Sequence, residues 1–86
     1  MAEHISTHSI ERLGQILRQH RKKAGLSRIQ LAEIAGLGKT VIYDVEKGKP
    51  TVRLNTLFKL FDVLNIKVYI DSPLMESMEN IGNEKS

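Results

Sequence analysis

Apolar side chains recur at three- and four-residue intervals in four successive segments of the first 65 residues. This spacing places them on one face of a helix, and it predicts helices over about 10–24, 28–35, 39–47 and 54–64. Residues 66–71 instead alternate apolar and polar side chains, with β-branched residues at the apolar positions, which predicts one short strand. The pattern therefore predicts a mainly α fold of four or five helices with a single C-terminal β-strand.

The second and third predicted helices are separated by a short turn that contains glycine. Ser27 precedes the second helix, where its side-chain oxygen can accept a hydrogen bond from a free backbone N–H. Gly36 follows that helix, at a position where left-handed backbone angles are common. The third helix begins near Lys39 and ends before Gly48. Two helices joined in this way are typical of a helix-turn-helix, whose second helix enters the major groove of DNA.

The residues of this segment carry a resemblance to a known family. Ala32 stands at the small position where the two helices touch, and Ile42 and Val45 stand at buried positions of the second of them. The segment closes with EKGKP at residues 46–50, which is similar to an acidic-x-Gly-basic ending. Over about residues 10–66 these features resemble the Cro/C1-type (XRE family) helix-turn-helix repressors. The resemblance implies a lambda-repressor-like domain that binds double-stranded operator DNA.

The same resemblance implies an ion pair between the first and third helices. Arg21 lies near the end of the first helix, and Glu46 lies near the end of the third. In this interpretation Arg21 pairs with Glu46 and holds the two helices together, which is a structural rather than a base-reading role.

The exposed side of the third helix supplies the candidate base-reading residues, which are Lys39, Thr40, Tyr43 and Asp44. Lysine can donate to guanine O6 and N7, and threonine can touch a thymine methyl group. Tyr43 can pack on a sugar or a thymine or bond a phosphate, and a half-buried surface ring is the alternative. Asp44 would repel phosphates unless it accepts from a cytosine amino group or pairs locally.

Residues that flank the third helix are candidates for phosphate contacts. Arg28 opens the second helix, where a guanidinium could hold a phosphate through two hydrogen bonds. The full set is Arg28, Gly38, Lys47, Lys49, Arg53 and Asn55. Phosphate contacts position a protein without reading sequence, so we expect these residues to set affinity and its salt dependence.

The fourth predicted helix and the strand after it suggest a homodimer. A core stripe is predicted at Leu54, Leu57, Phe58, Phe61 and Leu64. Leu60 and Val63 lie off that stripe yet are apolar, which favours a partner surface formed with a second copy. A lone strand also needs a partner for its backbone groups, and the same strand of a second copy could supply it. The predicted dimer contacts are Leu60, Val63, Ile66, Val68, Tyr69 and Ile70.

A strand directly after the fourth helix is less general among Cro/C1-type repressors. The run LNTLFKLFDVLNIKVYIDSPL at residues 54–74 resembles the HipB-like antitoxins. This narrower resemblance implies an antitoxin that dimerises through the strand, neutralises a HipA-like kinase toxin and represses its own operon. A free-standing Cro/C1-type regulator of phage or host, with no toxin partner, is the alternative.

The ends of the chain are predicted to differ from its centre. We expect a flexible N-terminus over 1–8, a DNA-binding domain over 9–65 with Ser9 capping its first helix, and a dimerisation strand over 66–71. The acidic tail over 72–86 is open to two interpretations, a short amphipathic helix that begins at Ser72 and Pro73 or a frayed end.

Charge agrees with a polyanionic partner for the centre of the chain. The 86 residues carry a net charge of +3. Residues 10–67 hold 12 Lys and Arg against 5 Asp and Glu, a net charge of +7, and the two ends together carry −4. A basic centre of this kind suits nucleic acid.

Composition argues against several other classes. Cysteine is absent, which excludes a disulfide framework and thiolate ligands and fits a reducing cytoplasm. We find no nucleophile, phosphate-loop, cofactor or metal-ligand motif, so we expect neither an enzyme nor a cofactor. No apolar run approaches the roughly 20 residues that a membrane span needs. We therefore expect a bacterial cytoplasmic protein associated with the nucleoid and not with a membrane.

Overall fold

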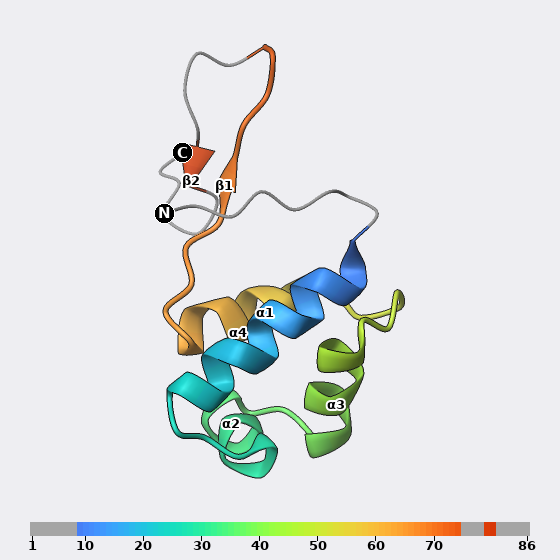
Figure 1. The fold of residues 1–86 in the computed structure, drawn as a ribbon, viewed down its shortest axis with the longest axis vertical. Helices are drawn as coiled ribbons and strands as arrows, with labels where there is room; N and C mark the ends of the chain where they lie inside the picture. The colour runs from blue at the N-terminus through green and yellow to red at the C-terminus, as the bar shows by residue number, and fades with distance from the viewer. Residues whose placement is uncertain (1–8, 75–78, 81–86) are drawn as a thin grey trace.

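Four helices form the body of the structure, and a short hairpin extends away from them (Figure 1). The computed structural model describes residues 9–74 and 79–80. The helices are α1 (Ile10–Lys23), α2 (Arg28–Ala35), α3 (Lys39–Lys47) and α4 (Leu54–Val63). The predicted mainly α fold and its four helical segments are confirmed.

Local hydrogen bonds define the turn between α1 and α2 and the turn between α2 and α3. The Ser27 side chain accepts from the Gln30 N–H at 3.1 Å, and the Gln30 side chain accepts from the Ser27 N–H at 2.8 Å. This capping box satisfies donors that the first turn of a helix leaves free. Gly36 ends α2 with φ of 68°, and the N–H of Leu37 then donates to the Ala32 carbonyl at 2.8 Å. Both predicted boundaries of α2 are confirmed.

The predicted side-chain cap on α1 is wrong. Ser9 occupies the N-cap position, but its side chain makes no capping hydrogen bond. Its φ of −109° and ψ of 55° differ from the extended geometry in which a serine oxygen reaches the first free N–H groups.

The helices bury one apolar core, which consists of Leu17, Leu31, Ala32, Ala35, Ile42, Val45, Leu60 and Phe61. The short α2 contributes three of these side chains, while its Ile29 and Ile34 remain exposed. Val41 of α3 is partly buried beside this core. The buried side of α3 therefore leaves its opposite side free to face solvent.

The predicted orientation of α4 is wrong in two places. Leu60 was expected on a partner surface but is only 1% exposed within the single chain, whereas Leu54 was expected in the core and is 63% exposed. Apolar side chains lie around most of the circumference of α4, so their spacing alone does not predict which side is buried. The contact of α4 with α2 decides which side is buried. Leu60 consequently has no area left for a second copy. Val63 is partly buried against the same core.

Two glycines bring α1 into backbone contact with the end of α3. A Cβ built on Gly14 would lie 2.5 Å from the carbonyl oxygen of Val45 and 2.7 Å from that of Glu46. Gly48 has φ of 78°, and a Cβ there would lie 2.7 Å from the Cα of Glu11. Such distances exclude any side chain, so glycine at both positions allows the two helices to approach this closely. The position of α3 is thus set by direct contact between backbones.

The C-terminal strand is shorter than predicted and has a partner in its own chain. β1 (Tyr69–Ile70) pairs antiparallel with β2 (Glu79–Asn80), with Tyr69 opposite Asn80 and Ile70 opposite Glu79. The expectation of a single strand that pairs with the same strand of a second copy is therefore wrong for the described residues, because the tail of the same chain supplies the hydrogen-bonding groups. A tail helix that includes these two residues is excluded as well.

The remaining predictions for the chain ends lie outside the described residues. These are the flexible N-terminus over 1–8 and the states of residues 75–78 and 81–86. Among the expected dimer residues of the C-terminal segment, Ile66 and Val68 pack partly against the helical core, whereas Tyr69 and Ile70 are exposed. Figure 1 shows β1 and β2 standing clear of the four helices.

Candidate nucleic-acid interface

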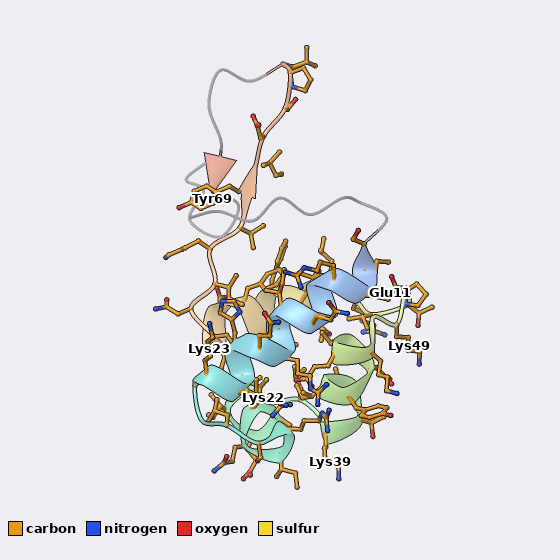
Figure 2. All side chains as sticks on the ribbon, in the orientation of Figure 1. Glu11, Lys22, Lys23, Lys39, Lys49 and Tyr69 are labelled. Carbon is orange, nitrogen blue, oxygen red and sulfur yellow. The ribbon has the colours of Figure 1, made fainter. Side chains whose placement is uncertain are left out.

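One side of α3 faces solvent, and it carries the residues that the sequence analysis singled out. Lys39, Thr40 and Tyr43 are exposed, while Ile42 and Val45 on the opposite side are buried. Figure 2 shows Lys39 pointing away from the body at the start of α3, and Lys49 pointing away from it beyond the other end. The exposed side of α3 is therefore flanked by cations at both ends.

A buried ion pair fixes the end of α3 to α1. The Arg21 Nε lies 2.6 Å from Glu46 Oε2, and its Nη2 donates to Oε1 at 3.1 Å. Its Nη1 donates to the Leu26 carbonyl at 2.9 Å. The two charged side chains are only 7% and 4% exposed. Two parallel charge-assisted hydrogen bonds make this contact strong and directional, and the structure thus contains the pair that the resemblance implied.

Arg28 has internal partners that the sequence analysis missed. Its Nε donates to Glu46 Oε1 at 3.0 Å, and its guanidinium carbon lies over the Tyr43 ring, 5.4 Å from the ring centroid. Arg28 was expected to hold a phosphate. In the structure its contacts with Glu46 and Tyr43 join α2 to α3. No sequence pattern signals this contact, because 18 positions separate Arg28 from Glu46 and only the folded turn brings them together.

Asp44 pairs locally, which is one of the two roles left open for it. Its Oδ2 lies 3.5 Å from the Nζ of Lys49, and the two side chains are partly exposed. The lysine partly offsets the negative charge of Asp44 beside the exposed side of α3. Lys47 lies one turn after Tyr43, and its Nζ is 5.0 Å from the centroid of the Tyr43 ring.

The other expected phosphate residues lie at the ends of α3 and α4. Gly38 is the N-cap of α3 and is exposed, with its carbonyl accepting from Val41 and Ile42. Arg53 is the N-cap of α4, and both it and Asn55 are exposed. Gly38, Arg53 and Asn55 are therefore all accessible to solvent.

Metal and membrane sites receive no support from the part of the chain that the structure describes. Within residues 9–74 and 79–80, no group of three or more His, Cys, Asp or Glu side chains is arranged to hold a metal ion. The same residues contain no helix long and apolar enough to cross a membrane.

Comparison with known proteins agrees with this geometry. A helix-turn-helix family model matches residues 17–69. The uncharacterized HTH-type transcriptional regulator y4mF of Sinorhizobium fredii is 33% identical over 73 residues, which are 85% of this chain and 93% of that protein. Control protein C.SmaI of Serratia marcescens is 37% identical over 75 residues, which are 87% of this chain and 84% of that protein.

Solved structures show the same fold. The restriction-modification controller protein C.AhdI of Aeromonas hydrophila is 37% identical and superposes with a TM-score of 0.59 over 66% of this chain and 85% of its own. A chain in the structure of the HipA-HipB-O2-O3 complex superposes with a TM-score of 0.70 over 81% of this chain and 99% of its own, at 20% identity. The latter likeness concerns the fold alone.

The family model covers more than half of the chain, and both curated relatives exceed 30% identity over most of its length. The matched residues cover α2, α3 and α4 completely, and they include the exposed, cation-flanked side of α3 described above. The chain therefore belongs to the helix-turn-helix family of transcriptional regulators, of the Cro/C1 (XRE) type.

Proposed function

We propose that this protein is a sequence-specific DNA-binding transcriptional regulator that acts as a homodimer on palindromic operator DNA. The observation that carries the proposal is the exposed side of α3, with Lys39, Thr40 and Tyr43 facing solvent on a helix held by a buried ion pair. A rigid helix that presents donors and an aromatic ring fits the major groove of DNA. Such a function belongs in the bacterial cytoplasm, at the nucleoid.

The side chains on α3 suit different parts of a base pair. Lys39 can donate to guanine, Thr40 can contact a thymine methyl group, and the Tyr43 ring can pack against a pyrimidine or a sugar. Asp44 can accept from a cytosine amino group, but its Oδ2 already lies 3.5 Å from the Nζ of Lys49. We therefore assign base reading to Lys39, Thr40 and Tyr43 and give Asp44 a secondary role in it.

Backbone phosphates would bind around this helix. The proposed contacts are made by Gly38, Lys47, Lys49, Arg53 and Asn55, which lie at the ends of α3 and at the start of α4. Each cation that reaches a phosphate releases counterions, so affinity should fall steeply as salt rises.

A homodimer would present one α3 to each half-site, with half-site centres about 34 Å apart or a multiple of that distance. Exposed apolar side chains that a second copy could cover include Leu54 on α4 and Tyr69 and Ile70 on β1. We propose that these residues, and not Leu60, form the dimer contact, with Val63, Ile66 and Val68 at its margin. Sedimentation of the intact chain at micromolar concentration tests this, and a monomeric mass contradicts it.

The experiment that tests the function is selection of bound duplexes from a random library, followed by affinity measurements on the selected duplex and an unrelated one. Lys39→Ala and Thr40→Ala should each cost about 1–3 kcal/mol on the selected duplex and much less on the unrelated one. Gln19→Ala, an exposed position on α1, is the control and should change neither affinity. Failure of the wild-type protein to bind any duplex at low salt would overturn the proposal.

Two kinds of regulator are candidates for this protein. The relatives that are 37% identical carry the names of controller proteins, one of them a restriction-modification controller, which favours a free-standing regulator. The fold of the chain in the HipA-HipB-O2-O3 complex superposes over 81% of this chain, against 66% for C.AhdI, which keeps an antitoxin of the HipB type as a second candidate. A neighbouring restriction or methylation gene supports the first. Tight binding of this protein to a kinase encoded beside it supports the second.

A further inference from the structure

The carboxylate of Glu46 is shared by two arginines, one from each neighbouring helix. Arg21 of α1 donates to both of its oxygens, and Arg28 of α2 donates to Oε1. Because the Glu46 side chain is 4% exposed and is held from two sides, it is a fixed acceptor at the end of α3. Arg28 is anchored at its Nε by this acceptor, although 35% of its side chain is exposed.

Anchored in this way, the Arg28 guanidinium lies over the ring of Tyr43, with 5.4 Å between its carbon and the ring centroid. A cation within about 6 Å of a ring centroid is attracted to the ring face. Lys47 adds a second cation over the same ring at 5.0 Å. Tyr43 is 44% exposed, so packing against the core does not by itself fix its orientation. The cations around the ring therefore supply a restraint that the core does not.

We propose that Arg28 is a specificity-determining positioning residue, which orients the Tyr43 ring on α3 for contact with DNA bases. The inference rests on the proposed function, because it assumes that α3 reads DNA. Arg28 then contributes to the choice of sequence through Tyr43, in addition to any phosphate that its Nη1 and Nη2 groups reach. The Glu46 carboxylate links this role to the ion pair that fixes α3 itself.

The geometry requires a guanidinium at position 28. A guanidinium donates through N–H groups at its edge while its face can lie on an aromatic ring, so one side chain holds both Glu46 and Tyr43. A lysine ammonium is a compact charge that is more strongly hydrated and lacks this fork. Arg28→Lys therefore keeps the charge that a phosphate would attract and removes the restraint on the ring.

The first experiment compares Arg28→Lys with Arg18→Lys, the same substitution at an exposed position on α1. Affinity is measured on the duplex selected by the wild-type protein and on an unrelated duplex, over a range of salt. Arg28→Lys should lower the ratio of the two affinities by about tenfold, with affinity for the unrelated duplex and its salt slope unchanged. Arg18→Lys should change neither. An equal loss on both duplexes would assign Arg28 to phosphate alone and overturn the proposal, as would an unchanged ratio.

The second experiment asks whether Arg28 acts through Tyr43. In a Tyr43→Ala background, Arg28→Lys should cause no further loss of the affinity ratio, because the ring that it orients is gone. A full additional loss would mean that Arg28 reads bases directly, which contradicts the proposal. Circular dichroism of each variant verifies that the helices remain folded.

A third measurement is independent of DNA. The chain has two tyrosines, so the ring resonances of Tyr43 can be assigned by NMR against Tyr69. Arg28→Lys should shift the Tyr43 ring resonances and average its side-chain rotamers, while the Tyr69 signals remain unchanged. An unaltered Tyr43 ring would overturn the positioning role. Absence of DNA binding by the wild-type protein, by contrast, would refute the proposed function and with it the role of Arg28 in specificity, whereas the restraint of Arg28 on the Tyr43 ring would stand.

Discussion

Substitution of Gly14 by alanine tests whether the contact between α1 and α3 depends on the missing side chain. Gly14 lies in the middle of α1, where glycine is a poor helix former. The structure explains its presence by the carbonyl oxygens of Val45 and Glu46, which would lie 2.5 and 2.7 Å from an alanine Cβ. Both atoms belong to the backbone of α3 and cannot rotate away, so Gly14→Ala must push the two helices apart.

Two opposing terms determine the size of the effect. Alanine favours the helix over glycine by about 1 kcal/mol. Overpacking costs about 1–3 kcal/mol, and contacts this short against backbone atoms place Gly14→Ala at the upper end of that range. We therefore expect a net destabilisation of about 2 kcal/mol, which corresponds to a fall in Tm of roughly 8–16 °C for a chain of this size.

Urea and thermal unfolding, followed by circular dichroism, measure this change. Gln15→Ala is the matched control, because it alters an exposed neighbour on the same helix and should change the free energy of unfolding by less than about 0.5 kcal/mol. If Gly14→Ala proves as stable as the wild type, or more stable, the clash is too small to exceed the gain in helix propensity. The inferred backbone contact would then be wrong.

Three further predictions concern the ion pair, the core and the phosphate contacts. Removing either partner of the buried Arg21–Glu46 pair should lower the free energy of unfolding by about 3–5 kcal/mol. A double-mutant cycle should show strong coupling between the two residues, and additive losses would contradict the ion pair. Leu60→Ala should destabilise the chain by about 2–5 kcal/mol, whereas Leu54→Ala should have a small effect in dilute solution. Unfolding measurements that reverse this order would refute the assignment of Leu60 to the core. Lys49→Ala should weaken binding to selected and unrelated duplexes alike and reduce the slope of affinity against salt by about one. A loss confined to one sequence in binding titrations would contradict a phosphate contact.

The candidate site was predictable from the sequence only where short-range rules apply. Lys39, Thr40 and Tyr43 share a side of one helix, and a period of 3.6 residues is sufficient to place them opposite Ile42 and Val45. The partners of Arg28 were not predictable, because its contacts with Glu46 and Tyr43 depend on the angle between α2 and α3. Asp44 shows the intermediate case, since pairing was foreseen as one alternative but Lys49 was not named as the partner.

The sequence by itself determined the elements whose physics is local. Ser27 and Gln30 stand three positions apart, as a capping box needs, and Gly36 supplies the left-handed angle that ends α2. Tertiary structure decided the buried side of α4, with Leu60 inside, and the pairing of β1 with the tail of its own chain. An apolar helix or an unpaired strand accepts several partners at similar free energy. The choice among them depends on which surfaces the rest of the fold brings within contact distance.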